Sequence, residues 1–295
     1  MNLSFAMLTD DQFDRTQRLA SRLTGIQLFE RHRELLERRS RRLGIDDSAE
    51  FEAVLQAAEV GDQRAGRQLI GLFTTNFTGF FRHPWHFHLA AEHALRTVDR
   101  RGEARLWSAA ASSGEEPYSL AMALINVFQR DDPPATILAT DVDADALAVA
   151  RKGEYEDRAL RSPIDGDRES CGLSTDQVFR FFTRRDGSCW SFKPAVRRLV
   201  EFREINLAEV PWPVEGRFDV IFCRNVLMYL EGGRRLEVLE RLASLMAPDG
   251  LLMLDPTEHP GRAEKWFSVA ASGVYTRRRE PGHRAARLHS QGLNL

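Results

Sequence analysis

The residues best suited to chemistry in this sequence follow short apolar runs. Ser112, Ser113 and Gly114 come after one such run and lead directly into Glu115 and Glu116. Small residues let a ligand lie close to the backbone, and the start of a helix offers free N–H groups. Two carboxylates would repel a pyrophosphate but suit a ligand with positive charge and hydroxyl groups, such as S-adenosylmethionine (SAM). Alternatively, they only complement the helix dipole.

Two further runs end in polar residues. Asp141 closes the second run, 27 residues after Gly114, where a carboxylate can accept hydrogen bonds from ribose hydroxyls. The alternative is that Asp141 caps a helix that begins near Asp143. Asn206 follows the third run, and its amide can donate to and accept from an adenine edge while Leu207 packs on the ring. An ordinary loop would also explain that pair.

The fourth run ends in Arg224 and Asn225, with Tyr229 close behind. Polar residues at the end of a buried strand indicate either a site or a turn. Upstream, the segment 74–87 combines aromatic and polar residues. A helix core would explain its phenylalanines but not Asn76, Thr78 and Arg82.

Four histidines crowd behind Arg82, namely His83, His86, His88 and His93. A zinc site needs convergent ligands, whereas His86 and His88 diverge on a helix and no cysteine or carboxylate joins them at zinc-finger spacing. We therefore expect no metal site.

Alternating strands and helices must position these groups. Strands are expected at 104–110, 135–141, 199–205, 218–224 and 250–255, with helices at 116–129, 143–152 and 232–246. This rhythm predicts a parallel sheet, whose ligands bind at the carboxyl ends of the strands. The Asp186-Gly187 pair within 179–192 predicts an inserted antiparallel hairpin, and residues 9–70 are expected to be helical.

Composition favours a folded protein of the cytoplasm. The 295 residues are 43% hydrophobic and 28% charged, with a net charge of −2 that gives no global attraction to nucleic acid or membrane. No apolar run approaches the roughly 20 residues that span a bilayer. Three scattered cysteines form no disulfide framework.

Five segments together resemble the CheR family of chemotaxis receptor protein-glutamate O-methyltransferases. They are TTNFTGFFR, LWSAAASSGEEPYSLAMAL, ATDVDADALAVARKGEY, FREINL and FDVIFCRNVLMYL. They occur in the family's order with compatible spacing, and the resemblance covers roughly residues 8–276. It implies an α/β fold: a Rossmann-like SAM-dependent methyltransferase domain (89–295) with a small antiparallel β-subdomain (about 176–198), preceded by an all-α N-terminal domain (1–88).

The resemblance also implies a site. Carried over by motif, the cofactor positions are Asn76, Thr78, Arg82, Glu116, Asp141, Asn206, Leu207, Asn225 and Val226. Glu115 is the less favoured of the acidic pair. The catalytic pair falls on Arg82 and Tyr229.

The implied reaction transfers a methyl group from SAM to glutamate side chains of chemotaxis receptors, leaving S-adenosylhomocysteine. The implied partners are the cytoplasmic helical region of the receptors and, in some family members, their C-terminal tail peptide. The basic stretch 31–42, with six arginines, would face the receptor, unless it is only a solvated helix face. Two alternatives stay open: a SAM-dependent O-methyltransferase of another protein or small molecule, and a non-catalytic SAM-sensing adaptor. Neither nucleic acid nor membrane insertion is expected.

Two positions depart from the family pattern. Residues 255–260 read DPTEHP, where the family has a Gly-x-Ser-Glu ending, and Ser40 stands where leucine is common. We expect neither departure to touch the cofactor positions.

Overall fold

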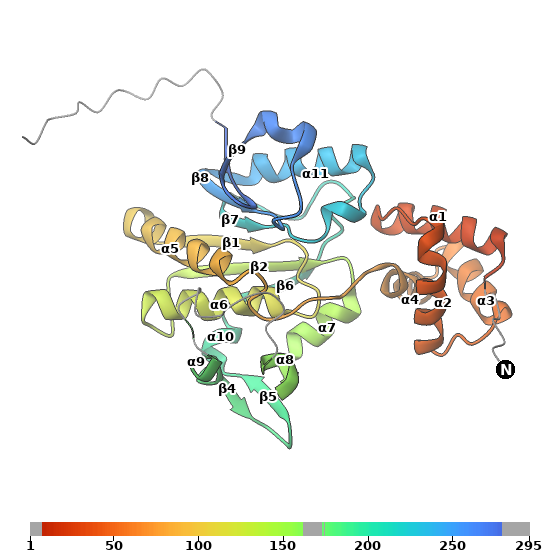
Figure 1. The fold of residues 1–295 in the computed structure, drawn as a ribbon, viewed down its shortest axis with the longest axis horizontal. Coiled ribbons are helices and arrows are strands. Elements are labelled where there is room, and N and C mark those ends of the chain that lie inside the picture. The colour runs from red at the N-terminus through yellow and green to blue at the C-terminus, as the bar shows by residue number, and fades with distance from the viewer. Residues whose placement is uncertain (1–7, 162–172, 174, 279–295) are drawn as a thin grey trace, which may run out of the picture.

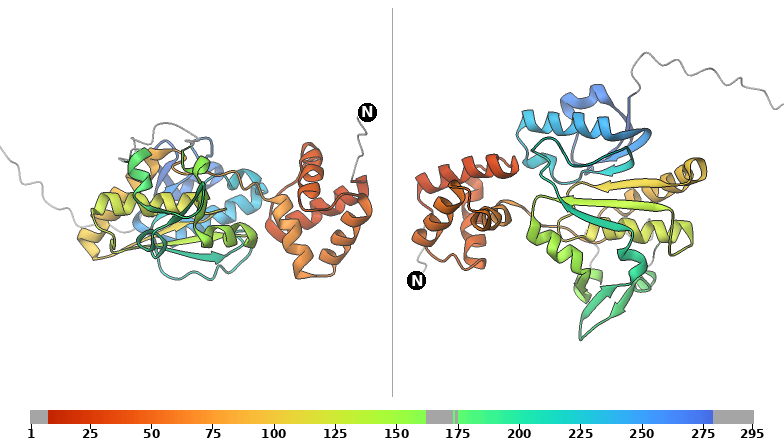
Figure 2. Two further views of the ribbon diagram at one scale, coloured as in Figure 1. Left: turned by 90° about the horizontal axis from the view of Figure 1, so that it is seen from below. Right: turned by 180° about the vertical axis from the view of Figure 1, so that it is seen from behind.

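The structure is a computed structural model that describes residues 8–161, 173 and 175–278. A small helical domain lies beside a larger sheet domain, as Figures 1 and 2 show. The elements of the helical domain are α1 (Asp10–Thr24), η1 (Glu30–His32), α2 (Arg33–Arg42), α3 (Ser48–Glu59) and α4 (Gln63–Phe73). They enclose a core of their own, built around Phe13, Phe51 and Leu69. The expected helical start of the chain is confirmed.

The larger domain is built on a seven-stranded sheet in the order β6-β2-β1-β7-β8-β10-β9. Its strands are β1 (Ala104–Ser108), β2 (Ala135–Asp141), β6 (Val200–Glu204), β7 (Phe218–Phe222), β8 (Met246–Met253), β9 (Phe267–Ala271) and β10 (Val274–Arg277). The first five are mutually parallel, as predicted. The antiparallel pair β9 and β10 was not predicted.

Helices cover both faces of this sheet, which places its strands between two apolar layers. One layer carries α5 (Pro84–Arg101), α6 (Glu115–Phe128) and α7 (Ala144–Lys152). The other carries α11 (Gly232–Leu245), followed by η4 (Gly261–Trp266). The carboxyl ends of the strands and their loops lie outside these layers and can meet a ligand.

A second, three-stranded antiparallel sheet in the order β3-β5-β4 forms the β-subdomain. The predicted hairpin is β4 (Phe182–Arg184) and β5 (Cys189–Phe192), and Phe182 stacks on Phe192 with ring centroids 4.0 Å apart. The third strand, β3 (Glu154–Glu156), lies before the predicted range of the subdomain. It was not predicted because it pairs with β5, more than 30 residues further along the chain. Short helices α8 (Asp157–Arg161), α9 (Thr175–Phe179) and α10 (Pro194–Arg197) complete this region.

The two domains are joined by the segment 74–83 and by contacts at the end of α1. Residue 88, the predicted boundary, lies inside α5, which packs against β1, β7 and α6. We propose to place the boundary within 74–83 instead. Gly25 ends α1 with φ +72°, and a Cβ there would come within 2.5 Å of the Ala208 Cβ. The end of α1 therefore packs so closely against Ala208 that no side chain fits between the two domains at Gly25.

Hydrogen bonds reinforce this junction. The Asn206 amide donates to the Leu23 carbonyl oxygen (2.8 Å), and the Gln27 N–H donates to the Tyr229 carbonyl oxygen (2.8 Å). Within the described part of the chain, no helix is long and apolar enough to cross a bilayer.

Candidate cofactor and methyl-transfer site

A cleft that is partly open to solvent lies at the carboxyl ends of the parallel strands beside the helical domain. The cleft brings together every predicted site residue: Asn76, Thr78, Arg82, Glu116, Asp141, Asn206, Leu207, Asn225, Val226 and Tyr229. They come from five segments spread over about half of the chain.

The turn from β1 into α6 shapes the floor of the cleft. Gly114 has φ +99°, and a Cβ there would lie 2.8 Å from the Ala150 Cβ, so only glycine fits. Glu115 turns away from the cleft and accepts a hydrogen bond from the Ser113 hydroxyl (2.7 Å), whereas Glu116 lines the cleft. Of the two acids, only Glu116 is therefore placed to meet a ligand in the cleft.

Glu116 belongs to a buried polar cluster. Its carboxylate accepts a hydrogen bond from the Ser108 hydroxyl (2.7 Å) and lies 3.4 Å from the Arg224 guanidinium. Burial raises the pKa of Glu116, and the positive charge of Arg224 opposes that shift. A buried acid of this kind favours a ligand that brings positive charge or hydroxyl groups.

Asp141 is held at the end of β2 by two backbone donors. Ser112 N–H and Asp143 N–H donate to separate oxygens of its carboxylate, at 2.7 and 3.0 Å. Burial raises the pKa of Asp141 to about 6. The helix cap is Asp143, which accepts from Asp145 and Ala146 N–H. Asp141 is thus not the cap, and each of its oxygens retains acceptor capacity toward the cleft.

Two predicted amides already have protein partners. The Asn76 amide donates to Asp143 (2.8 Å), which fixes the loop that enters the cleft. The Asn206 amide donates to Leu23 and to Glu209 (3.0 Å). Both bonds use the Asn206 amide nitrogen, and the role of Asn206 toward an adenine edge stays a prediction. Leu207 lines the cleft beside it.

The loop that carries Arg82 is bent sharply. Phe81 and His83 on either side both have positive φ (56° and 57°), which costs energy for non-glycine residues. The Phe81 N–H donates to the Ser119 hydroxyl (2.9 Å), and the Arg224 guanidinium donates to the Arg82 carbonyl oxygen (2.7 Å). These contacts hold the loop so that the Arg82 side chain, 24% exposed, borders the cleft.

The expectation that residues 255–260 leave the cofactor positions untouched is wrong. The Asn225 amide donates to the Asp255 carboxylate (2.8 Å), and the Asn225 N–H donates to Glu258 (2.8 Å). Strand β8 pairs with β7, so the residues after both strands meet at the same edge of the sheet. Asn225 has φ +57°, and these acids stabilise its conformation. Ser40, the other departure, is buried in α2 and donates to the Leu36 carbonyl oxygen (3.0 Å).

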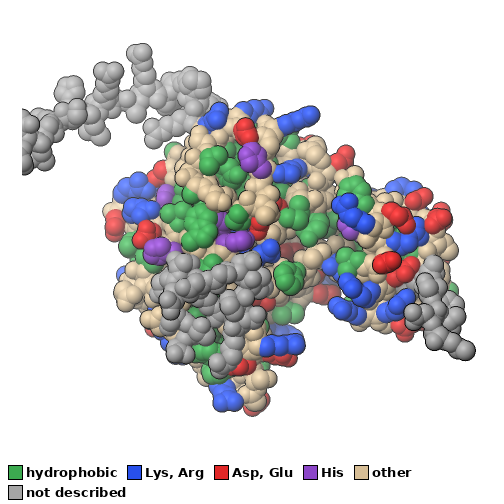
Figure 3. Space-filling model, in the orientation of Figure 1, with side chains coloured by type: hydrophobic (Ala, Val, Ile, Leu, Met, Phe, Trp, Pro, Cys, Tyr) green, Lys and Arg blue, Asp and Glu red, His purple; other side chains and the backbone are tan. Residues whose placement is uncertain are grey.

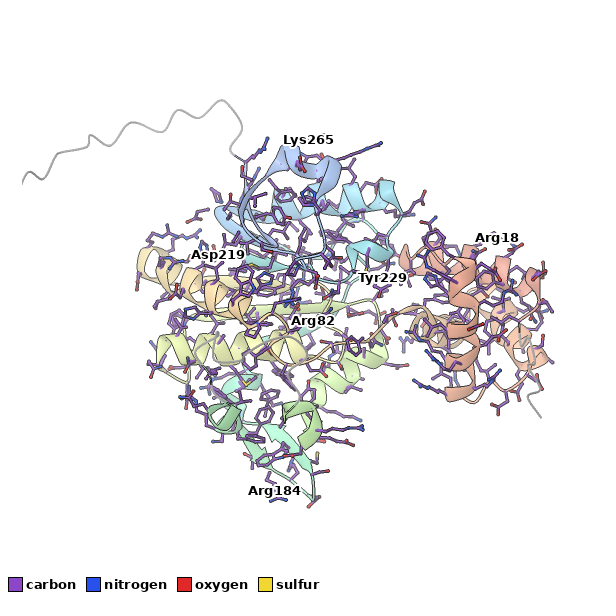
Figure 4. The ribbon with its side chains drawn as sticks, viewed as in Figure 1. Arg18, Arg82, Arg184, Asp219, Tyr229 and Lys265 are labelled. Atoms are coloured by element: carbon purple, nitrogen blue, oxygen red, sulfur yellow. The ribbon has the colours of Figure 1, made fainter. Side chains whose placement is uncertain are left out.

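Tyr229 lies closer to the helical domain than Arg82 does (Figure 4). It is half-buried in η3 (Leu227–Tyr229) and packs against the apolar core of that domain. The site is therefore completed by both domains.

Several residues of the site were not selected from the sequence. Arg224, Asp255 and Glu258 were visible as polar residues after strands, a signal that was available. Thr24 and Ile26 also line the cleft, but they come from the helical domain and carry no local signal. No group of His, Cys, Asp or Glu among the described residues has the arrangement of a metal site.

Comparison with known proteins shows the family to which the chain belongs. Residues 76–276 match the family model for the CheR methyltransferase, SAM binding domain. The chain belongs to the CheR methyltransferase family. It is 38% identical to chemotaxis protein methyltransferase 2 of Pseudomonas aeruginosa over 275 residues, which cover 91% of this chain and 93% of the relative. It is similar to the chemotaxis protein methyltransferases of Salmonella typhimurium (36%, covering 91% and 90%) and Escherichia coli (35%, covering 91% and 91%).

This CheR chain is accordingly a SAM-dependent methyltransferase, and its cleft fits that cofactor. When bound, SAM supplies a methyl group made electrophilic by a positively charged sulfur. The Asp141 carboxylate has acceptor capacity for hydroxyl groups, Glu116 supplies buried negative charge, and Leu207 and Val226 supply apolar surface. These groups suit the hydroxyl groups and the apolar ring of a nucleoside.

Proposed function

We propose that this CheR methyltransferase methylates glutamate side chains of chemotaxis receptors in the cytoplasm, forming methyl esters. The observation that carries the proposal is Arg82, a guanidinium held at the cleft that is lined by the predicted cofactor residues. Arginine is suited to orient a carboxylate because its paired N–H groups match the two oxygens. The names of the relatives, which are chemotaxis protein methyltransferases, agree with a receptor substrate.

The reaction requires no general base. A glutamate side chain has an ordinary pKa near 4.3 and is already a nucleophile at neutral pH. Arg82 would therefore orient the substrate, while the loop 74–83 and the end of α1 exclude water. Tyr229 would border the incoming group as well. Negative charge is lost as the ester forms, so a site with little water favours the transition state over the reactants.

The helical domain supplies a surface for the receptor. Four of the six arginines in 31–42 are exposed: Arg31, Arg38, Arg41 and Arg42. Arg33 is paired with Glu30 and Asp10, and Arg39 donates to the carbonyl oxygens of Leu72 and Thr74. Figure 3 shows Lys and Arg side chains gathered on this domain beside the hollow that separates it from the sheet domain. An acidic, glutamate-rich helix is the complementary partner.

The β-subdomain offers a second surface for a receptor tail. Strand β4 is an edge strand of its sheet, so one side of its backbone is available to pair with an extended peptide. This mode would tether the enzyme to its substrate without taking part in the chemistry.

The proposal is tested by incubating the purified chain with radiolabelled SAM and membranes that carry the organism's receptors. We expect base-labile label on receptor bands, and its loss in Arg82→Ala. Label confined to other proteins or small molecules would refute the receptor substrate. Tight SAM binding without any transfer would refute the enzyme activity and favour an adaptor.

A further inference from the structure

A buried carboxylate that the reaction has not yet used lies behind the site. Asp255 follows β8, and its side chain is only 3% exposed. One oxygen accepts hydrogen bonds from the Thr257 N–H (3.0 Å) and hydroxyl (2.7 Å). The other accepts from the Asn225 amide (2.8 Å) and lies 3.2 Å from His83 Nε2 and 3.8 Å from Arg82 Nη2. One carboxylate thus touches a cofactor position and the proposed catalytic arginine together.

This carboxylate is ionised at neutral pH. Burial by itself would raise the pKa of Asp255, but the hydrogen bonds from Thr257 and Asn225, with His83 close by, hold it well below its usual range. Its negative charge is therefore permanent, and it faces the Arg82 guanidinium from the interior side of the cleft.

We propose that Asp255 is a positioning residue for methyl transfer, which fixes Arg82 relative to Asn225 and weakens the hold of Arg82 on the substrate carboxylate. The inference rests on the proposed role of Arg82. It assigns a function to a position where the resemblance predicts glycine.

The physical reason lies in how charge changes during the reaction. The substrate carboxylate is fully charged when it binds and loses charge as its oxygen bonds to the methyl carbon. An unopposed guanidinium would therefore stabilise the bound substrate more than the transition state, which lowers kcat. A counter-ion at 3.8 Å reduces that excess stabilisation while the guanidinium keeps its orienting N–H groups.

The test is Asp255→Asn, which keeps an oxygen to accept from Asn225 but removes the charge. At saturating SAM we expect KM for the receptor and kcat both to fall by about two- to tenfold, the lower part of the range of couplings between contacting residues. The dissociation constant of SAM should change less than either. Asp255→Glu, which restores the charge, should recover part of both parameters.

Asp249→Asn is the matched control. Asp249 lies toward the opposite end of β8 and pairs with Arg100 and Arg101, so the same charge is removed far from the cleft. It should leave KM and kcat unchanged. A fall in kcat with KM unchanged or raised in Asp255→Asn would overturn the inference, as would an unaltered enzyme.

The two proposals fail separately. Full turnover in Arg82→Ala would overturn the role of Arg82 itself. Lost turnover in that variant, together with an unchanged KM in Asp255→Asn, would overturn only the role of Asp255.

Discussion

The two walls of the cleft are built differently. The sheet wall carries buried acids, Glu116 and Asp141, whose oxygens are held by hydroxyl and backbone donors. The helical-domain side presents Thr24 and Ile26 to the cleft, and the same domain carries exposed arginines on its surface. Phe77, an exposed apolar side chain, also lines the cleft, and exposed Met228 lies in η3 next to Tyr229.

The difference separates two tasks. Groups fixed by several hydrogen bonds can recognise one small ligand in one orientation, because their geometry exists before binding. Exposed cationic side chains on a helix instead favour encounter with a large charged partner, and each contributes little alone. The sheet wall should therefore control cofactor affinity and chemistry, and the helical wall should control the protein substrate.

Substitution of Arg82, which lies between the two walls, should have the largest effect. We expect Arg82→Ala to lower kcat about 100-fold or more, because misorientation of the attacking group alone can have that cost. Binding of SAM, measured by calorimetry, should stay within a few fold. Arg82→Lys keeps the charge but not the paired N–H groups, so intermediate activity is expected if orientation matters.

Asp141 tests the sheet wall. Asp141→Asn should weaken SAM binding by about 10- to 100-fold, since hydrogen bonds to a charged group contribute roughly 1.5–3 kcal/mol. Receptor binding should be unaffected.

The same residue predicts a pH dependence. Its pKa of about 6 means that Asp141 becomes protonated as the pH falls through that value. SAM affinity of the unaltered chain should therefore decline below about pH 6. A decline of equal size in Asp141→Asn would assign the titration to another group.

Gly25 tests the junction between the walls. Gly25→Ala should lower the free energy of unfolding by about 2 kcal/mol, because it combines positive φ with overlap of the Ala208 side chain. Thermal melting measures the change.

Gly44→Ala separates these two causes. Gly44 has φ +74°, nearly that of Gly25, but nothing lies within 4 Å of its Cβ position. Gly44→Ala should lower the free energy of unfolding by only about 1 kcal/mol, because only the backbone conformation is unfavourable there. Equal losses in both variants would mean that the close approach of the domains is unimportant.

The smallest effect is expected on the exposed surface of α2. Arg38→Ala should raise KM for the receptor about two- to fivefold, and less at high salt, because an exposed charge acts mainly on encounter. Arg18 is an exposed arginine on α1 of the same domain (Figure 4). Arg18→Ala should leave KM for the receptor unchanged. An identical effect of both would indicate a nonspecific dependence on net charge.

The sequence predicted the sheet wall well because its residues follow strands. Once the strands are known to be parallel, Asp141 and Asn225 must share an edge, whatever their separation in the chain. The partners of these residues were harder to predict. The adenine contact of Asn206 stays a prediction, and its amide also ties the sheet domain to Leu23.

The helical wall could not be located in this way. Its contribution to the cleft depends on how α1 docks, and no periodicity in 10–26 specifies a surface on another domain. The contact of Asp255 with Asn225 was missed for a related reason. The order of neighbouring strands, which decides that contact, is not contained in the local pattern of either one.

Thr24 and Ile26 of the helical domain line the cleft together with residues of the sheet domain, so a cofactor that fills the cleft and the docking of the domains should be interdependent. A ligand that prefers the docked arrangement must tighten docking by the same factor by which docking improves its affinity. S-adenosylhomocysteine should thus slow amide exchange at the end of α1, even though most of that helix lies outside the cleft. Bound cofactor would in this way hold the helical domain, which carries the proposed receptor surface, in its docked position.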